Sequence, residues 1–198
     1  MNKNFDFKLS ITDILCIAII LLAIPGIMYL PVKFGYENGF IENLQIIVLF
    51  TSCYYAIRAK ENRKFFNLVL MFLGILLLRE VNCGRTIFFP IPGVENAFYS
   101  WKDIKYGWLA HPLFGIYIGA TVLYGLWNKF YIDLWNILKK TKLPFWSILF
   151  LIIGIVLSLV AEKCTHNFLF EEFSELLMYI SLLSIIKKYS QKEYSEIK

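Results

Sequence analysis

The stretch ILCIAIILLAIPGIMYL, residues 14–30, decides the fold class of this chain. It contains no charged residue, and with its flanks it reaches the roughly 20 mostly apolar residues that a helix needs to cross the hydrocarbon core of a bilayer. Lys3 and Lys8 precede the run, and no small-residue cleavage site follows it. These features predict an uncleaved signal anchor rather than a signal peptide that is removed.

Five further apolar runs follow along the chain, which has 198 residues, 58% of them hydrophobic and only 18% charged. Soluble domains are about one quarter charged, so this composition is typical of a membrane protein. The sequence predicts one all-α membrane domain, residues 1–198, built as a polytopic bundle of six transmembrane helices. The predicted spans cover residues 12–32, 40–57, 65–80, 107–127, 145–161 and 168–186.

The connections between the spans carry an asymmetric charge, which predicts their orientation. With the N-terminus in the cytoplasm, 14 of the 20 basic residues fall in cytoplasmic segments, whereas 9 of the 15 acidic residues fall on the outer side. Lysine and arginine are enriched in the cytoplasmic loops of membrane proteins. Both termini of the predicted six-span protein are therefore expected in the cytoplasm.

Two connections are longer than simple turns. Residues 128–143 predict an amphipathic helix that lies on the cytoplasmic surface of the bilayer, with Phe130, Leu134 and Leu138 on its apolar side. An ordinary cytoplasmic loop is the alternative. The outer loop, residues 81–106, is rich in aromatic side chains. It either caps a cavity between helices or rests on the lipid surface.

Small residues and cysteines indicate two further contacts. Gly115 and Gly119 lie four residues apart in the fourth span, a spacing that lets helices approach closely in lipid. Cys83 and Cys164 both fall at predicted outer helix ends, where the surroundings are oxidising. A disulfide between them and two unrelated thiols are both open alternatives.

Three glutamates lie inside the last predicted span. Glu171, Glu172 and Glu175 share one face of the predicted helix with Tyr179, because successive residues turn by about 100°. Ionisable groups inside a span are costly and are a functional hypothesis by default. Three carboxylates at this depth need protons, a metal or basic partners.

Polar residues of other spans are predicted at the same outer level. The second span begins with acidic and amide side chains, and the third ends with an arginine–glutamate pair. We therefore expect one binding site at the outer ends of the helices. Its candidate residues are Glu42, Gln45, Arg79, Glu80, Arg85, Glu171, Glu172 and Glu175.

Three interpretations of this charged layer compete. A divalent metal such as zinc, iron or manganese is the first, because carboxylates and histidines are suitable ligands. Anion or lipid-headgroup binding by Arg79 and Arg85 is the second, since guanidinium groups fit phosphate and carboxylate. In the third, the arginines neutralise the glutamates and hold the bundle together. The candidate metal ligands are Glu162, His166, His111, Glu171 and Glu175.

Short motifs give the chain a resemblance to a known family. ENGFIENLQ at residues 37–45, LREVNCGR at 78–85 and FEEFSEL at 170–176 resemble a family of bacterial multi-pass inner-membrane proteins that has no established activity. The resemblance implies a location in the inner membrane, and it supplies no mechanism. It falls on the same glutamates and arginines that their depth in the membrane singles out.

These observations predict a membrane protein whose outer site binds a cation or a small polar solute, as a binding protein or a transporter. One alternative is a membrane enzyme, with or without a metal, that acts on a lipid or lipid-linked substrate with a glutamate as general base. Another is a structural or accessory subunit with an internal ion-pair cluster. The expected partners are the lipid bilayer and a solute, cation or lipid headgroup. No feature indicates a nucleic-acid partner.

Overall fold

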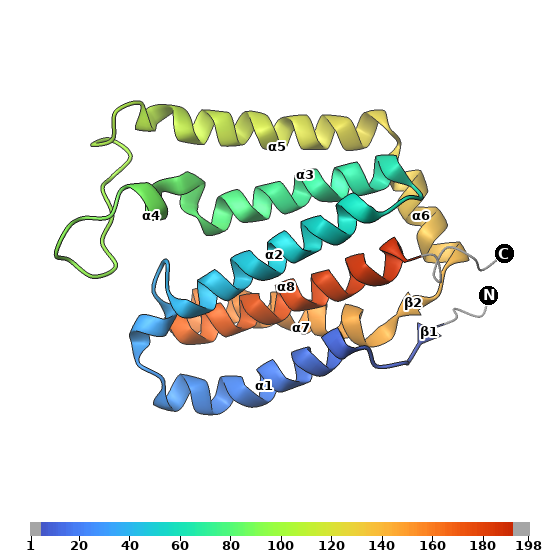
Figure 1. The fold of residues 1–198 in the computed structure, drawn as a ribbon, viewed down its shortest axis with the longest axis horizontal. Coiled ribbons are helices and arrows are strands. Elements are labelled where there is room, and N and C mark those ends of the chain that lie inside the picture. Colours follow the sequence, from blue (N-terminus) through green and yellow to red (C-terminus); the bar gives the residue numbers. More distant parts are fainter. Residues whose placement is uncertain (1–4, 192–198) are drawn as a thin grey trace.

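The computed structural model describes residues 5–191, which form a bundle of long helices (Figure 1). The helices and strands are β1 Phe5–Asp6, α1 Ile11–Tyr29, η1 Val32–Gly35, α2 Phe40–Arg58, α3 Arg63–Glu80, η2 Asn82–Gly84, α4 Arg85–Phe88, η3 Gly107–Leu109, α5 Ala110–Trp127, α6 Phe130–Lys140, β2 Leu143–Pro144, α7 Phe145–Val160, η4 Ala161–Thr165 and α8 Phe168–Ser190. Each of the six predicted spans corresponds to one long helix, so the all-α fold class is confirmed.

Not every long helix is apolar enough to cross a membrane by its composition. Within residues 5–191, four segments qualify, Ile11–Tyr29, Val32–Arg58, Gly107–Trp127 and Phe145–Thr165. A fifth qualifies if α3 and the short helices after it, which are bent by 56°, count as one span. Helix α8 is excluded because it has acidic residues near its start and two lysines near its end. Several helices that could span a membrane fit a membrane protein, while six spans remain a prediction.

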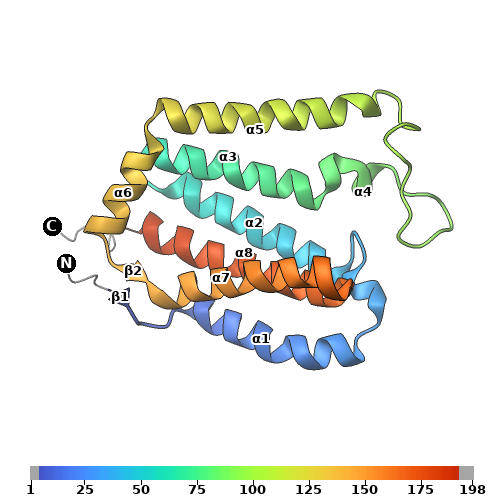
Figure 2. The same cartoon turned by 180° about the vertical axis from the view of Figure 1, so that it is seen from behind.

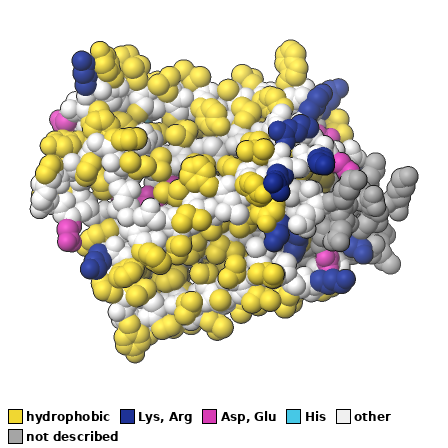
Figure 3. Space-filling view, in the orientation of Figure 1, with side chains coloured by type: hydrophobic (Ala, Val, Ile, Leu, Met, Phe, Trp, Pro, Cys, Tyr) yellow, Lys and Arg dark blue, Asp and Glu magenta, His cyan; other side chains and the backbone are white. Residues whose placement is uncertain are grey.

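The bundle has two different ends (Figures 1 and 2). Both described ends of the chain lie at one end of the bundle, which we call the terminal end. There β1 pairs in parallel with β2, with Phe5 opposite Leu143, and α6 crosses from α5 toward α7. At the loop end lie η1, α4 and the long connection before α5. Figure 3 shows Lys and Arg side chains gathered at the terminal end, with a wide hydrophobic surface between the two ends.

Helix α8 is the centre of the bundle. It packs against α1, α2 and α7, and it has more buried residues than any other helix described. One apolar cluster joins it to α1, α2 and α7, and a second joins it to α2 and α3. Helix α5 is held less firmly and packs mainly against α3. The polar residues of α8 are therefore shielded from the surroundings by neighbouring helices.

Close helix packing occurs at a different glycine from the pair that the sequence indicated. A Cβ atom on Gly154 of α7 would lie 2.8 Å from the backbone nitrogen of Met178 in α8. A Cβ atom on Gly115 or Gly119 would meet nothing within 4 Å, so the expected packing through this pair is wrong within the described chain. These two glycines lie on a face of α5 that no described helix covers.

Several other expectations are corrected or refined. The first helix ends at Tyr29 rather than at residue 32, because Leu30 precedes a proline and is extended. Cys83 and Cys164 are both free thiols, so the disulfide is not formed. The predicted amphipathic helix at 128–143 is present as α6. Lys3, Lys192, Glu193, Glu196 and Lys198, which entered the charge comparison, lie outside the described residues.

Candidate functional site

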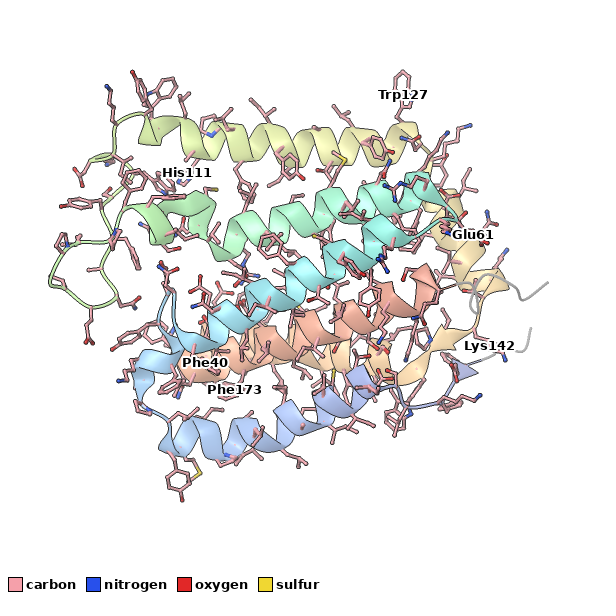
Figure 4. The ribbon with its side chains drawn as sticks, in the orientation of Figure 1. Phe40, Glu61, His111, Trp127, Lys142 and Phe173 are labelled. Atoms are coloured by element: carbon pink, nitrogen blue, oxygen red, sulfur yellow. The ribbon has the colours of Figure 1, made fainter. Side chains whose placement is uncertain are left out.

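Seven polar side chains from α2, α3 and α8 meet near the loop end. We call this group the loop-end cluster: Glu42, Gln45, Arg79, Glu80, Glu172, Glu175 and Tyr179. Figure 4 places Phe40 of α2 and Phe173 of α8 toward this end, with Glu61 and Lys142 at the opposite end. Six of the eight predicted binding residues belong to the cluster, so the expected convergence of helices α2, α3 and α8 is found.

An ion pair between α3 and α8 forms one side of the cluster. Arg79 donates to Oε1 of Glu175, and its Nε lies 3.9 Å from Oε1 of Glu80. The hydroxyl of Ser158 in α7 lies 3.4 Å from the same Glu175 oxygen. The two carboxylate side chains are each only 5% exposed, whereas that of Arg79 is 49% exposed. The guanidinium therefore marks an edge at which the cluster reaches the surface.

Hydrogen bonds connect the remaining members of the cluster. The hydroxyl of Tyr179, which is fully buried, donates to Oε1 of Glu80 at 2.5 Å. The amide of Gln45 donates to Oε2 of Glu172 at 2.7 Å and to the backbone oxygen of the same residue at 3.0 Å. These bonds join α8 to α3 through Tyr179 and to α2 through Gln45.

Two acceptor atoms in the cluster lack a donor. The backbone N–H of Asn38 donates to Oε2 of Glu42, but Oε1 of Glu42 and Oε1 of Gln45 are buried without a hydrogen-bond partner in the described part of the chain. Buried polar groups are normally paired, so two orphan oxygens on one helix are unusual. Both belong to residues that are at most 3% exposed.

The charges of the cluster are not balanced. Four carboxylates, those of Glu42, Glu80, Glu172 and Glu175, face the single guanidinium of Arg79. Buried charges need partners, and neighbouring carboxylates disfavour one another's ionised forms. The site therefore calls for additional positive charge, as bound protons or as a cation.

Two predicted binding residues lie outside these contacts. Arg85, on α4, lies 4.0 Å from Glu37 and places its guanidinium 6.0 Å from the ring centre of Phe98. It helps to dock the long loop on the start of α2, where Asn38 also donates to the backbone oxygen of Thr86. Glu171 is half-buried, and its carboxylate joins none of the cluster's hydrogen bonds or ion pairs in residues 5–191. Arg79 and Arg85 thus have different partners and do not form one anion-binding fork.

The residues proposed as metal ligands do not come together. Across the part of the chain that the structure describes, no three His, Cys, Asp or Glu side chains are arranged to hold a metal ion. His111 packs edge-on against Trp101, with ring centres 5.8 Å apart. Glu162 is exposed in η4, and His166 ends that helix with a positive φ of 49°. The metal interpretation therefore has no geometric support from residues 5–191.

A second polar cluster, at the terminal end, was missed by the sequence analysis. Asp13 of α1 is completely buried and pairs with Lys188 of α8 at 2.8 Å. Ser147 of α7 and Ser184 of α8 donate to its other oxygen at 2.6 and 3.1 Å. The signal was available: Asp13 lies inside the first apolar span, three residues after Ser10, a spacing that can cap a helix.

We compared the chain with known proteins by family, sequence and structure. No protein-family model, curated protein or solved structure matches it. The resemblance to a bacterial inner-membrane family stays a prediction, and the function has to be argued from the two clusters themselves.

Proposed function

We propose that this chain is an integral membrane protein that binds a small cationic solute in the loop-end cluster. The observation that carries the proposal is that four carboxylates, three of them buried and that of Glu172 partly buried, face one guanidinium, together with two buried acceptors that lack donors in the described chain. A cation would supply the missing charge, and N–H groups on it would supply the missing donors.

The charge imbalance argues against a purely structural cluster. An internal ion pair that only holds helices together is expected to be close to neutral, because uncompensated buried charge is destabilising. The terminal-end cluster, with Asp13 against Lys188, is neutral in this way. The loop-end cluster would be neutral without a ligand only if three of its four carboxyl groups held protons, so a structural or accessory role is the weaker alternative.

The open acceptors favour a cation that carries N–H groups. Oε1 of Glu42 and Oε1 of Gln45 lie one helical turn apart on α2, and each can accept a hydrogen bond. Primary ammonium groups carry three donors, whereas quaternary ammonium groups carry none. We therefore expect an ammonium-bearing solute to bind better than a quaternary one of equal charge.

The surroundings favour binding over passage through the protein. Beyond Tyr179, toward the terminal end, α2, α3 and α8 pack through an apolar core that includes Leu49, Leu73 and Phe66. Such a core offers no polar path for an ion. We propose that the loop end faces the outside of the bacterial inner membrane and that the solute enters there, with both termini in the cytoplasm.

The test is ligand-dependent thermal stability of the detergent-purified protein. Ethanolamine hydrochloride, choline chloride and sodium chloride are compared at equal ionic strength. A ligand at 100 times its Kd stabilises the folded state by about 2.7 kcal/mol. Ethanolamine is expected to raise Tm, and choline, which lacks N–H donors on its nitrogen, is expected to raise it much less.

Two variants connect this effect to the cluster. Glu42→Gln and Glu172→Gln keep an oxygen for the present donor but remove the charge, so each should abolish the rise in Tm. Glu162→Gln removes an exposed charge near the same end and should leave the rise intact. Equal effects of all three salts, or a full ethanolamine response in Glu42→Gln/Glu172→Gln, would contradict the proposal.

One observation favours a second candidate, an enzyme that acts on a lipid or lipid-linked substrate. Arg79 is half exposed beside the buried carboxylate of Glu175, so a phosphate at the surface could reach the guanidinium. In this case a phosphate-bearing lipid should co-purify with the protein. Mass spectrometry should show that lipid lost in Arg79→Lys, which retains the positive charge but lacks the planar fork.

A further inference from the structure

A large apolar groove lies between helices of the bundle. Its volume is about 580 Å³, within the range of roughly 300–1,000 Å³ that is usual for ligand pockets. Side chains of α3, α5, α6 and α8 line it, among them Phe65, Val69, Val122, Leu126, Leu134 and Leu182. The groove lies toward the terminal end, away from the loop-end cluster.

The chain path explains the groove. Helix α5 packs on α3, and α7 packs on α8, so α5 and α7 lie apart from each other (Figure 2). Helix α6 connects them across the terminal end and turns Phe130, Tyr131, Leu134 and Leu138 into the space. These four residues belong to the apolar side that the sequence predicted for the amphipathic helix. Ile137 lines the groove with them, whereas Trp135, which was predicted on the same side, does not. The groove is therefore closed by α6 at one end and walled by helices along its length.

A polar pocket adjoins the groove at the terminal end. Its volume is about 400 Å³, and Arg58, Lys60, Glu61, Ser190 and Gln191 are among the residues that line it. Phe66 and Tyr189 line both spaces, so the two spaces are adjacent. Among the described residues that line this pocket, two side chains are basic and one is acidic, which gives them a net positive charge.

We propose that the groove and the pocket together bind one anionic glycerophospholipid. An acyl chain would occupy the groove, and the headgroup phosphate would lie in the pocket near Arg58 and Lys60. Basic pockets between helices at the cytoplasmic surface are suited to anionic headgroups. The groove holds an acyl chain and the adjacent basic pocket holds an anionic headgroup. We therefore expect an anionic lipid to bind here more tightly than at the rest of the apolar surface of the bundle.

This inference does not depend on the cation site. The residues that line the groove and the pocket share none with the loop-end cluster. Loss of lipid binding and loss of ethanolamine binding are therefore separate results, obtained with different variants.

The test is native mass spectrometry of the full-length protein released from detergent. Phosphatidylglycerol and phosphatidylcholine with identical acyl chains are added at equal concentration. We expect one bound phosphatidylglycerol per protein, preferred over phosphatidylcholine by roughly tenfold, because two basic residues contact an anionic headgroup. Arg58→Gln/Lys60→Gln should remove the preference, whereas Lys102→Gln/Lys105→Gln, at the loop end, should retain it.

A second pair of variants tests the groove itself. Val122 lines the groove and is 56% exposed, so Val122→Trp should fill the space and lower the binding of both lipids. Leu123, which is 68% exposed and does not line the groove, provides the control Leu123→Trp. Equal retention of the two lipids by the wild type would overturn the proposal. So would unchanged phosphatidylglycerol binding in monodisperse Val122→Trp.

Discussion

Asp13 and Glu42 are both buried carboxylates in long apolar helices, but their surroundings differ. Asp13 accepts hydrogen bonds from Ser10, Ser147 and Ser184 and pairs with Lys188. Glu42 has one donor and an oxygen without a partner in the described chain. The first carboxylate is saturated and neutralised, as a structural group should be. Glu42 keeps one oxygen without a hydrogen-bond partner in the described chain, as expected of a group that binds a ligand.

Replacement of Asp13 tests the structural role of the terminal-end cluster. Asp13→Asn leaves Lys188, whose side chain is only 12% exposed, without its counter-ion. Breaking a buried pair costs roughly 3–5 kcal/mol, and this pair is close to that case. The double variant Asp13→Asn/Lys188→Met removes both charges and should recover part of this loss. The measurement is Tm in detergent, with Glu61→Gln, an exposed acid at the same end, as control. If the single variant is as stable as Glu61→Gln, the pair has no structural role.

At the residue scale, the sequence predicted the loop-end cluster because charges inside apolar runs are rare and costly. It could not assign partners: Arg79 meets Glu175 and Glu80, and Gln45 meets Glu172, which depends on how α2, α3 and α8 are rotated against one another. Asp13 was missed because it was counted with the flanking charges. The structure places it in the first turn of the first helix, where it takes part in a capping box with Ser10.

At the element scale, α8 combines high polarity with deep burial. It carries three glutamates, yet Glu175, Tyr179 and the serines along it are buried by neighbouring helices. The central helix of a membrane bundle can carry such groups because it contacts protein rather than lipid. Its charged residues exclude α8 from the helices that could span a membrane by composition, although it is as long as the helices around it.

The contact between α7 and α8 depends on Gly154. A methyl group there would lie 2.8 Å from the backbone nitrogen and 3.0 Å from the Cα atom of Met178, so α8 would have to move. Gly154→Ala should destabilise the protein by about 1–3 kcal/mol, the usual cost of overpacking. Gly119→Ala is the matched control, since nothing lies within 4 Å of that position. We expect Gly154→Ala, and not Gly119→Ala, to lower Tm in detergent. Equal Tm values for the two variants would show that α8 can shift away from residue 154 without loss of stability.

Helix limits were predicted well because each is set by local chemistry. Runs of apolar residues and the change to amphipathic character after Trp127 are visible in the sequence. Pro31 is visible too, but the first predicted span ran past it to residue 32, whereas the helix ends at Tyr29. Which faces touch is not a local property. Gly115 and Gly119 have a favourable spacing but no neighbour, whereas the isolated Gly154 lies against the backbone of α8. Spacing indicates that two helices could approach, and only the path of the whole chain decides whether they do.

At the scale of the whole molecule, the two ends of the bundle differ in charge. Lys and Arg side chains gather at the terminal end, beside α6 and both described ends of the chain (Figure 3). The acid-rich cluster lies near the loop end. The sequence analysis used the same separation of basic and acidic residues to predict the orientation. It gives each end its own proposed ligand, a cation at one and an anionic lipid at the other.

The orientation itself can be tested with thiols on either side of α7. Cys164 is exposed at the loop end of this helix, and Lys142 is exposed at its terminal end. With the other cysteines replaced by serine, Cys164 should react with a membrane-impermeant maleimide added outside intact spheroplasts. A cysteine in place of Lys142, with Cys164 also replaced, should react only after the membrane is permeabilised.

Each pattern of labelling has a defined meaning because the two positions are separated by a single helix, Phe145–Val160, with its π-helical extension. The reverse pattern would place the loop end in the cytoplasm, so the cation site would face inward and the basic pocket would face away from the cytoplasmic leaflet. Equal labelling of both positions before permeabilisation would mean that α7 does not cross the membrane, although Phe145–Thr165 is long and apolar enough to do so. Only labelling of Cys164 alone is compatible with a solute that enters from outside and an anionic lipid that binds from the cytoplasmic leaflet, because both proposals rely on the same direction of α7.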